Sequence, residues 1–526
     1  MNSTHPVSLR PSAEGLSARS SSTPSLVEAL AWAGALAHRS RLWDDSPRLD
    51  PMPRGPGVYP APPPSLPPGV DGPWPQKPPF DPAFYAPVLD VPVADRLDHV
   101  RFIVSRYLRQ LATEVPGAAA RALGGPRLEA VDDDELSRIL TETSLGQFLL
   151  PLADGDAGGA FAEIVAGSAG PYGTMDFTFV APPETRLPGM YVAPVEVLAR
   201  HDGARWKVVA IRVDRRVVRP TERNAWELAR WYALQAAQTR LVCSAHPRLH
   251  FPSDVINAVT RAVVPAGHAL RELIEPHTRF TLGLHEAVIY NRRSVIHNSQ
   301  REIYTPFPYT TEGMHLLVIA GKQGVAGNAA WPEWRYGDLF VGDHVPYGRY
   351  RAAWLDAMTR FAAEALAEVA PGDAVVRAWA DHIASWLPGF PDGRAIEHEG
   401  ALARAVALYL CTVSVFHTGD HHSYANIGVD KLPWRLRVEM PAEGPVARVD
   451  PDALVTAEDV LRWRLAHAMF FKPSVITSLR DVKYRFRSAG GRRAVARWRD
   501  AMTALDERWS RSGFPSSHEI GSGVHY

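Results

Sequence analysis

The sequence predicts a mainly α-helical protein with a small antiparallel β element. Through most of the chain, apolar residues recur every three or four positions, as in VADRLDHVRFIVSRYLRQLA from residue 93, which is the period of an amphipathic helix. Between residues 172 and 216 the period changes. The segments YGTMDFTFV, GMYVAPVEVLARHD and ARWKVVAIRVD alternate or run β-branched, and Gly, Pro and Asp separate them. This pattern is typical of short strands joined by turns.

The first 80 residues form a leader of biased composition. Between residues 51 and 80, 13 of 30 residues are proline, which excludes a helix and favours an extended path. We expect one large domain over 81–526, with a small β region at about 172–216. Long helical patterns at about 222–262 and 400–428 carry the histidine motifs considered below.

Composition narrows the functional class. Of the 526 residues 46% are hydrophobic and 22% charged, as in soluble globular proteins. Lys and Arg together equal Asp and Glu at 57 each, which argues against a chain dominated by attraction to nucleic acid or to an anionic membrane. The basic run KYRFRSAGGRRAVARWR is interpreted as a solvated helix face.

The two cysteines, Cys243 and Cys411, cannot form a disulfide framework, so a reducing compartment is expected. Each is interpreted as a small buried hydrophobe. The sequence shows no signal-peptide pattern and no apolar run of about 18 residues. We therefore expect a cytoplasmic protein without a transmembrane segment.

Two pairs of nitrogen- or oxygen-bearing side chains suggest a metal site. His246 and His250 are four residues apart, and so are His422 and Asn426. On a helix this spacing stacks two side chains on one face. Two such pairs on facing helices would make a nitrogen-rich metal site. Because the chain has 20 histidines, one such pair also arises by chance, and the flanking residues matter more.

The flanks resemble the lipoxygenase family. HALRELIEPHTRFTL resembles the family's histidine followed by PHxRxTL, and FHTGDHHSYANIG resembles its second metal helix, with the pattern H-x3-N/H-x-G. Other stretches resemble further family elements and occur in the family's order. They are MDFTFV, MYVAPVEVL and KVVAIRV, followed by WELARWY, VPYGRYRAAWLDAMTRF and AVVRAWADHI. The resemblance covers about residues 80–526. The leader does not resemble the β-barrel domain that precedes the catalytic domain in plant and animal members.

The resemblance implies a non-haem iron oxygenase; manganese accepts the same ligands. The implied ligands are His246, His250 and His422, with Asn426 as a weak fourth and the carboxylate of Tyr526 where the family ends in isoleucine. In this chemistry the oxidised metal takes a hydrogen atom from a weak C–H bond of an unsaturated lipid, and O2 meets the carbon radical in a dry, apolar channel.

The chain departs from the family at the first histidine pair. The family spaces these histidines five apart with a local π-type widening, whereas His246 and His250 are four apart. Pro247 and Pro252 flank the second of them on either side. Proline removes a helix N–H and clashes one turn back, so the helix is expected to kink or restart here.

Further departures concern the surroundings of the metal. Val242 and Val429 stand where the family has polar residues that bridge the two metal helices, which should alter ligand orientation. Val288 aligns with the small residue that shapes oxygen access, and we place Phe251 in the same pocket. The larger Val288 predicts altered regiochemistry.

Several alternatives stay open at this point. His417 or His421 would replace a ligand if the register of the second pair slips, and His518 or His525 would do so if the tail threads inward; His268 and His277 are interpreted as structural. The function could instead be that of a divergent enzyme that oxidises or rearranges a polyketide, terpenoid or aromatic product. A third alternative is a metal-free relative that binds an apolar ligand or a partner protein.

Overall fold

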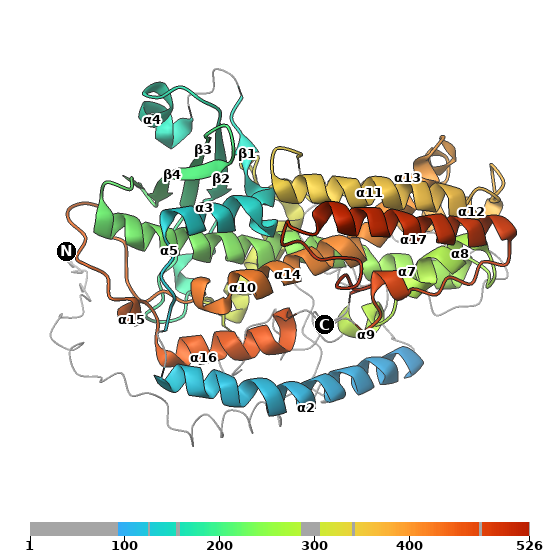
Figure 1. The fold of residues 1–526 in the computed structure, drawn as a ribbon, viewed down its shortest axis with the longest axis horizontal. Coiled ribbons are helices and arrows are strands. Elements are labelled where there is room, and N and C mark those ends of the chain that lie inside the picture. Colours follow the sequence, from blue (N-terminus) through green and yellow to red (C-terminus); the bar gives the residue numbers. More distant parts are fainter. Residues whose placement is uncertain are drawn as a thin grey trace, which may run out of the picture.

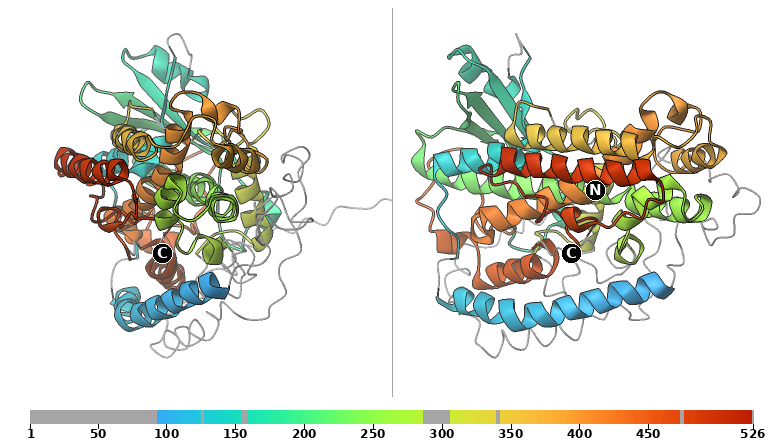
Figure 2. Two further views of the ribbon diagram at one scale, coloured as in Figure 1. Left: turned by 90° about the vertical axis from the view of Figure 1, so that its right-hand side faces the viewer. Right: turned by 45° about the vertical axis from the view of Figure 1, so that its right-hand side comes forward.

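The computed structural model describes residues 93–124, 127–153, 158–285, 306–338, 342–472 and 476–524. A small β-sheet lies at one end of an elongated body of helices (Figure 1). Long helices run side by side along this body, and α2 lies along its lower edge (Figures 1 and 2). The leader, residues 1–80, lies outside the described residues.

The helices of the N-terminal half lead to the first histidine pair and then past it. They are α2 (Val93–Gly124), α3 (Asp133–Glu142), α4 (Ala162–Ala166), α5 (Arg223–Arg240), α6 (His246–His250), α7 (Ser253–Val263), α8 (Ala269–Ile274) and α9 (Thr281–His285). A π-helical turn, η6 (Leu241–Ala245), joins α5 to α6 without a break. Pro252 is the N-cap residue of α7, so the chain restarts its helix at the second proline.

The C-terminal half supplies the second histidine helix and the helices that enclose it. They are α10 (Thr311–Gln323), α11 (Pro346–Ala365), α12 (Ala374–Ala384), α13 (Ala401–Cys411), α14 (His417–Ile427), α15 (Pro451–Leu454), α16 (Ala457–Ala466) and α17 (Ala489–Trp509). Two more π-turns occur here: η11 (Thr412–Phe416) joins α13 to α14, and η13 (His467–Phe471) ends α16. The arginine-rich run falls largely on α17, which exposes Arg492, Arg493 and Arg497.

The sheet is an antiparallel meander in the order β1-β2-β3-β4-β5. Its strands are β1 (Leu150–Pro151), β2 (Tyr172–Phe177), β3 (Val195–His201), β4 (Trp206–Val213) and β5 (Arg216–Val218). One face buries β-branched side chains against α3 and α5, because alternate residues of a strand point to the same side. The prediction of a mainly α fold with a small antiparallel sheet is confirmed.

Two hydrophobic cores meet at the histidine helices. One core contains the sheet, α3 and α5, and the other contains α7, α11, α12, α13 and α17. The chain crosses from the first core to the second between Cys243 and Leu249, and it crosses back between Phe416 and Ile427. Both histidine pairs lie at these crossings, where two packed bodies on either side hold their helices in place.

The helix that includes α13 and continues to Ser423 is long and apolar enough to cross a membrane by length and composition alone. Most of this stretch is buried inside the protein. Its apolar character therefore follows from its place in the core, because a helix enclosed on all sides is hydrophobic all round.

Gly321 allows α10 to approach the π-turn η6. A Cβ atom at this position would lie 2.5 Å from the carbonyl oxygen of Cys243 and 2.8 Å from the Cα of Ser244. We expect Gly321→Ala to lower the free energy of unfolding by about 1–3 kcal/mol, the usual effect of overpacking. Chemical denaturation would measure this change.

Gly117→Ala is the matched control, because nothing lies within 4 Å of a Cβ atom built at Gly117 in α2. Alanine there is expected to be neutral or to stabilise the helix by about 0.5–1 kcal/mol. Equal stabilities for the two variants would contradict a tight contact between α10 and η6.

Candidate metal centre

Four buried histidines converge where the two histidine helices face each other. His246 and His250 come from α6, and His417 and His421 come from the first turns of α14. All four residues are at most 9% exposed. Because each pair has four-residue spacing, both members of a pair lie on the same face of their helix.

The distances among the rings are those of a single cluster. The Nε2 atoms of His246 and His250 are 3.1 Å apart. One ring nitrogen from each of His246, His417 and His421 lies within 4.8 Å of the others. The His250 ring centroid is 4.9 Å from that of His417. Neutral imidazoles gathered in this way can share one ion, since each offers an in-plane lone pair.

His421 is oriented by a carbonyl group on a third element. Its Nδ1 atom is 2.8 Å from the carbonyl oxygen of Phe471, the last residue of the π-turn η13. A carbonyl can only accept, so Nδ1 carries the proton and Nε2 keeps a lone pair. Burial, then the nearby charge of His246, holds the pKa of His421 well below its usual value of 6.5. The ring is therefore neutral, as a metal ligand must be.

Asp420 faces His246 across the two helices. Its Oδ2 atom is 3.5 Å from Nδ1 of His246, and the side chain is only 2% exposed. Its other oxygen, Oδ1, accepts hydrogen bonds from the Tyr347 hydroxyl at 3.2 Å and from Nε2 of Gln147 at 3.4 Å. This arrangement orients the His246 ring so that its Nε2 atom points toward His250, as carboxylates commonly do for metal-bound histidines.

All three described π-turns of this chain end at the cluster. The turn η6 leads directly into His246, η11 leads directly into His417, and η13 ends at the carbonyl that accepts from His421. A π-turn adds one residue to a helix and rotates everything after it, and such turns are frequent at functional sites. Here the turns set the angular position of both histidine pairs.

The structure places His422 and Asn426 outside this cluster, which differs from the expected ligand set. Nδ1 of His422 is 2.8 Å from the amide of Asn426, and that amide also donates to the carbonyl of Gly513. Nε2 of His422 lies 3.8 Å from Glu519, and Asn426 is exposed. His422 follows His421 by one residue, which is about 100° around the helix. The cluster therefore contains His417 and His421 instead.

A sequence signal for His417 and His421 was present. HPRLH and HTGDH share the spacing H-x3-H, whereas the resemblance to a pattern that contains asparagine favoured His422 and Asn426. Asp420 and the carbonyl of Phe471 had no recognisable signal, because their roles depend on contacts between distant segments. His467, in η13, is a further, half-buried histidine near His421, and desolvation lowers its pKa to about 3.

The residues expected to line the substrate or oxygen pocket lie in different parts of the chain. Phe251 is buried directly after His250, and its ring lies 5.5 Å from that of Trp334. Val242 and Val429 both pack at the edge of the core that contains the sheet. Val288 and Tyr526 lie outside the described residues.

The tail threads into the protein beside α14. Residues 520–524 are buried, the amide of Gly521 donates to the Thr418 hydroxyl at 3.0 Å, and Nδ1 of His277 lies 2.6 Å from the carbonyl of Ser522. His277 therefore anchors the tail, in line with its interpretation as structural. His518 is exposed, and His525 lies outside the described residues.

The cysteines do not take part in the cluster as ligands. Cys243 lies in η6 and Cys411 ends α13, and both are fully buried. Burial raises the pKa of each thiol far above its usual value. Both therefore stay protonated and act as small hydrophobic side chains, as expected.

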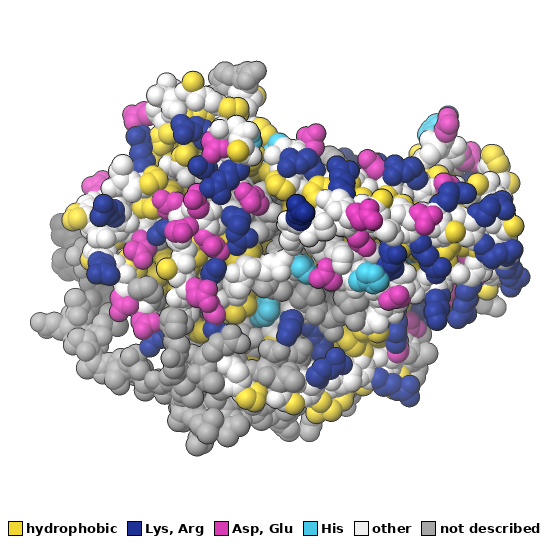
Figure 3. Space-filling model, viewed as in Figure 1, with side chains coloured by type: hydrophobic (Ala, Val, Ile, Leu, Met, Phe, Trp, Pro, Cys, Tyr) yellow, Lys and Arg dark blue, Asp and Glu magenta, His cyan; other side chains and the backbone are white. Residues whose placement is uncertain are grey.

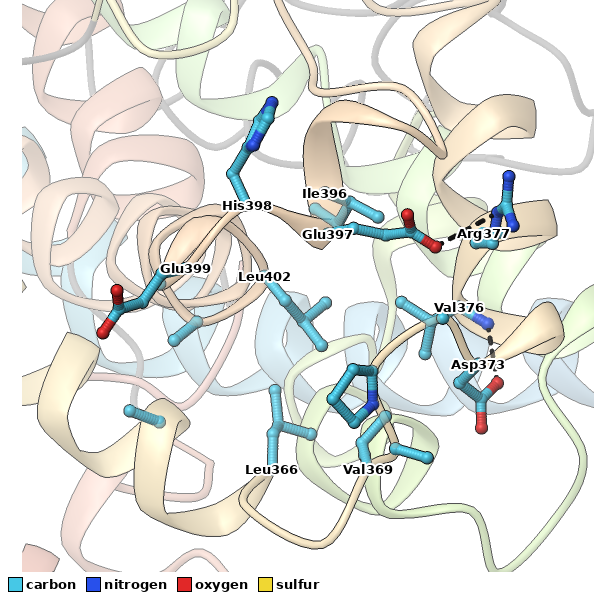
Figure 4. Close-up of a pocket in the computed structure, with 16 residues that line it drawn as sticks. Leu366, Val369, Asp373, Val376, Arg377, Ile396, Glu397, His398, Glu399 and Leu402 are labelled. Carbon is cyan, nitrogen blue, oxygen red and sulfur yellow. Dashed lines mark hydrogen bonds and ion pairs between the residues drawn. The ribbon is translucent and has the colours of Figure 1, made fainter.

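A surface pocket of about 260 Å³ lies beside the start of α12 and the start of α13 (Figure 4). Its apolar floor includes Leu366, Val376 and Leu402, and an ion pair between Arg377 and Glu397 lies at one side. The pocket adjoins Gly400, at the start of α13, 17 residues before His417. At 1.5 Å per helical residue it is roughly 25 Å from the histidines, so it is separate from them.

Comparison with solved structures identifies the architecture. Coral 8R-lipoxygenase matches with a TM-score of 0.59 at 13% identity, over 80% of this chain and 70% of that one. The manganese lipoxygenase of Gaeumannomyces graminis matches with a TM-score of 0.61 at 12% identity, over 82% and 90%. The chain has a lipoxygenase-like fold. By sequence, no protein-family model and no curated protein matches it.

A fungal lipoxygenase from Fusarium graminearum also matches, with a TM-score of 0.53 at 13% identity, over 83% of this chain and 86% of that one. Another lipoxygenase structure, solved in complex with arachidonate, has a TM-score of 0.59 at 13% identity, over 82% and 74%. At such identities the likeness establishes the shared lipoxygenase fold. The chemistry must be argued from the side chains of this chain.

The side chains present fit a metal ion. Two imidazole nitrogens 3.1 Å apart have the separation of neighbouring ligands on one ion, given metal–nitrogen bonds of about 2.1 Å. Nδ1 of His246 and Oδ2 of Asp420 are both buried and face each other, so His246 is oriented by a carboxylate as a ligand would be. The donor set is nitrogen-rich, which suits a transition-metal ion.

Two substitutions of Asp420 are expected to weaken metal binding to different extents. Asp420→Asn keeps an acceptor for Nδ1 of His246 and removes the charge, whereas Asp420→Leu removes both. We expect affinity to fall by about 10-fold for Asn and about 100-fold for Leu, the range seen when groups that orient a ligand are lost. Competition with a chelator would measure it.

Tyr347→Phe provides a milder comparison, because it removes only the hydroxyl that donates to Asp420. It should reduce affinity less than either Asp420 variant. Unchanged affinity in Asp420→Leu would show that Asp420 does not orient His246.

Proposed function

We propose that this protein is a lipoxygenase-like metal oxygenase that acts on an unsaturated lipid or a similar apolar substrate. One observation carries the proposal: four buried, facing imidazoles from α6 and α14 in a lipoxygenase-like fold. His246, His250, His417 and His421 would hold the metal, with iron or manganese as the candidates. The Tyr526 carboxylate remains a proposed additional ligand.

When bound, such an ion supplies a one-electron oxidant for a weak C–H bond and allows O2 to be added to the resulting carbon radical. The protein holds the imidazoles of His246 and His421 in fixed orientations. The Phe471 carbonyl holds the proton of His421 on Nδ1, and the Asp420 carboxylate faces Nδ1 of His246 at 3.5 Å. Each restrained ring thus presents one nitrogen to the centre of the cluster.

Apolar side chains enclose two of the four histidines. Leu249 and Phe251 pack into one core beside His250, and Val413, Val415 and Phe416 pack into it just before His417. An apolar enclosure protects a carbon radical from other hydrogen donors and suits a hydrocarbon chain. This enclosure is the reason for proposing an apolar substrate class.

The test has two stages. The protein is prepared from medium supplemented with iron or with manganese, and bound metal is measured by elemental analysis. Oxygen uptake is then followed with linoleate, with arachidonate and with saturated stearate as the control. We expect about one metal ion per chain and uptake with the unsaturated acids alone.

The outcomes separate the remaining functional classes. Bound metal without turnover of either acid would favour a divergent oxidase of another unsaturated product. A protein that binds neither metal under any condition would exclude the oxygenase, and an apolar-ligand-binding relative would then be the better hypothesis.

A further inference from the structure

His277 is a fully buried histidine that lies outside the four-histidine cluster. It ends the 3-10 turn η7 (Glu275–His277), which follows α8. Its two ring nitrogens contact two different segments of the chain. Nδ1 lies 2.6 Å from the carbonyl oxygen of Ser522, in the tail, and Nε2 lies 2.9 Å from the hydroxyl oxygen of Tyr484.

These two partners fix which nitrogen of His277 carries the proton. Burial lowers the pKa of the ring to about 4, so the ring is neutral at neutral pH and has one donor and one acceptor nitrogen. A carbonyl oxygen only accepts, so Nδ1 donates to Ser522 and Nε2 accepts from Tyr484. Burial also raises the pKa of the Tyr484 hydroxyl, which therefore keeps the proton that it donates.

Tyr484 reaches His277 because the segment before α17 turns alternate side chains inward. Residues 482–487 follow the pattern of an extended chain, in which successive side chains point to opposite sides. Lys483 and Arg485 are exposed, whereas Tyr484 packs against the core that contains α11 and α17. Figure 3 shows many Lys and Arg side chains on the surface along α17, which Figure 1 labels. The hydroxyl of Tyr484 is thus held on the inner side of a basic surface.

The tail that His277 holds also contacts α14, the helix of the second histidine pair. The amide of Gly521 donates to the Thr418 hydroxyl at 3.0 Å, and Thr418 directly follows His417. Ser522, whose carbonyl accepts from His277, directly follows Gly521. Two successive residues of the tail therefore join His277 to the first turn of α14.

A third segment fixes the tail along its own direction. The amide of Leu479 donates to the carbonyl of Ile520 at 2.7 Å. The amide of Ser522 donates to the carbonyl of Thr477 at 2.9 Å. These bonds resemble a short antiparallel pairing, and they leave the carbonyl of Ser522 for His277 and the amide of Gly521 for α14. The tail is therefore held from three sides, and none of these contacts is at the surface.

We propose that His277 is a positioning residue for the metal centre. By holding the tail at Ser522, it places the Gly521 amide against Thr418 and so fixes the first turn of α14, which carries His417 and His421. The inference rests on the proposed function of that centre. It gives a buried histidine that binds no metal a role in setting the geometry of two histidines that would bind one.

Two amide substitutions at His277 separate its two contacts. The amide nitrogen of asparagine can take the place of Nδ1 and donate to Ser522, whereas the longer glutamine reaches the place of Nε2 and contacts Tyr484 alone. Co²⁺ is the probe, because a chelator competition gives its affinity and its visible spectrum reports the ligand geometry. We expect His277→Gln to lower Co²⁺ affinity by about 10-fold and to change the spectrum. His277→Asn should stay within about twofold of the parent protein.

Variants of the two partners test the same route from its ends. Tyr484→Phe removes only the hydroxyl that donates to His277 and should bind Co²⁺ as the parent protein does. Thr418→Val removes only the acceptor of the Gly521 amide and should weaken binding as much as His277→Gln, while Thr418→Ser should retain it. Because both losses act through one tail, the double variant His277→Gln/Thr418→Val should lose about 10-fold, whereas independent effects would multiply to about 100-fold.

Thermal melts without metal establish that each variant is folded. A parent-like Co²⁺ affinity in His277→Gln, or a multiplied loss in the double variant, would overturn this inference and leave the proposed function intact. A loss in His277→Asn as large as that in His277→Gln would overturn it as well, since the bond to Ser522 would then not be the cause. A parent protein that binds no metal would overturn the proposed function and this inference together.

Discussion

His417→Ala and His421→Ala are each expected to abolish tight metal binding, whereas His422→Ala is expected to retain it. The first two variants remove imidazoles that lie within 4.8 Å of His246 in the buried cluster. We expect affinity to fall by more than about 100-fold, because losing a ligand should exceed the effect of losing a group that only orients one. Chelator competition and elemental analysis measure this loss directly.

His422→Ala is the matched control, since it removes the neighbouring imidazole from the same helix. That ring contacts Asn426 and Glu519 near the surface, and exposed substitutions usually change free energies by no more than about 0.5 kcal/mol, or roughly twofold in affinity. Asn426→Ala should behave in the same way. Loss of metal in His422→Ala with retention in His417→Ala would restore the ligand set expected from the sequence.

Acid is expected to destabilise the metal-free protein strongly, starting well above the range in which carboxylates titrate. Burial lowers the pKa of both His99 and His277 from 6.5 to about 4. The unfolded chain therefore takes up protons below about pH 6.5 while the folded protein stays neutral at both positions. The free energy of unfolding is therefore at its full value above pH 6.5. It decreases as the pH falls toward 4, because proton uptake favours the unfolded chain.

Each of these histidines should lower the free energy of unfolding by roughly 3 kcal/mol between pH 6.5 and pH 4, at 1.36 kcal/mol per pKa unit. Free energies of unfolding from guanidinium titrations between pH 8 and pH 4.5 would measure it. A free energy that stays constant between pH 7 and pH 5 would contradict the expectation.

His99→Phe isolates one of the two contributions. Among the described residues, Nε2 of His99 has no hydrogen-bond partner, and the ring lies 6.0 Å from that of Phe280. A phenyl ring of similar size removes the titrating group, leaves no unsatisfied Nε2 atom and should flatten the pH dependence. His398→Asn, in an exposed loop, is the control and should keep the parent profile.

Local periodicity predicted the fold well because the helices of this chain are long and amphipathic. The sheet was equally visible, since the residues of β2 and β4 largely alternate between buried and more exposed positions. Order among many weak motifs then indicated the family fold, which the structural likeness supports. None of these signals depends on knowing how segments meet.

The site was harder to predict, because it depends on angles around a helix. His421 and His422 are adjacent in sequence yet point in directions about 100° apart. The π-turn η11 determines which of them faces His246, because it sets the rotation of the helix that follows. Its sequence, TVSVF, carries no local signal for an added residue. The contacts of Asp420 and Phe471 join segments that are far apart in sequence.

The π-turns also affect the balance between the stability and the activity of this protein. A wide turn is less favourable than the α-turn that could replace it, yet the described chain keeps one beside each element of the histidine cluster. Shortening η11 by one residue would give a more regular helix and rotate His417 and His421 out of the cluster. Selection for a sturdier helix would thus remove the metal centre, so a conflict between stability and function is built into the backbone of these helices.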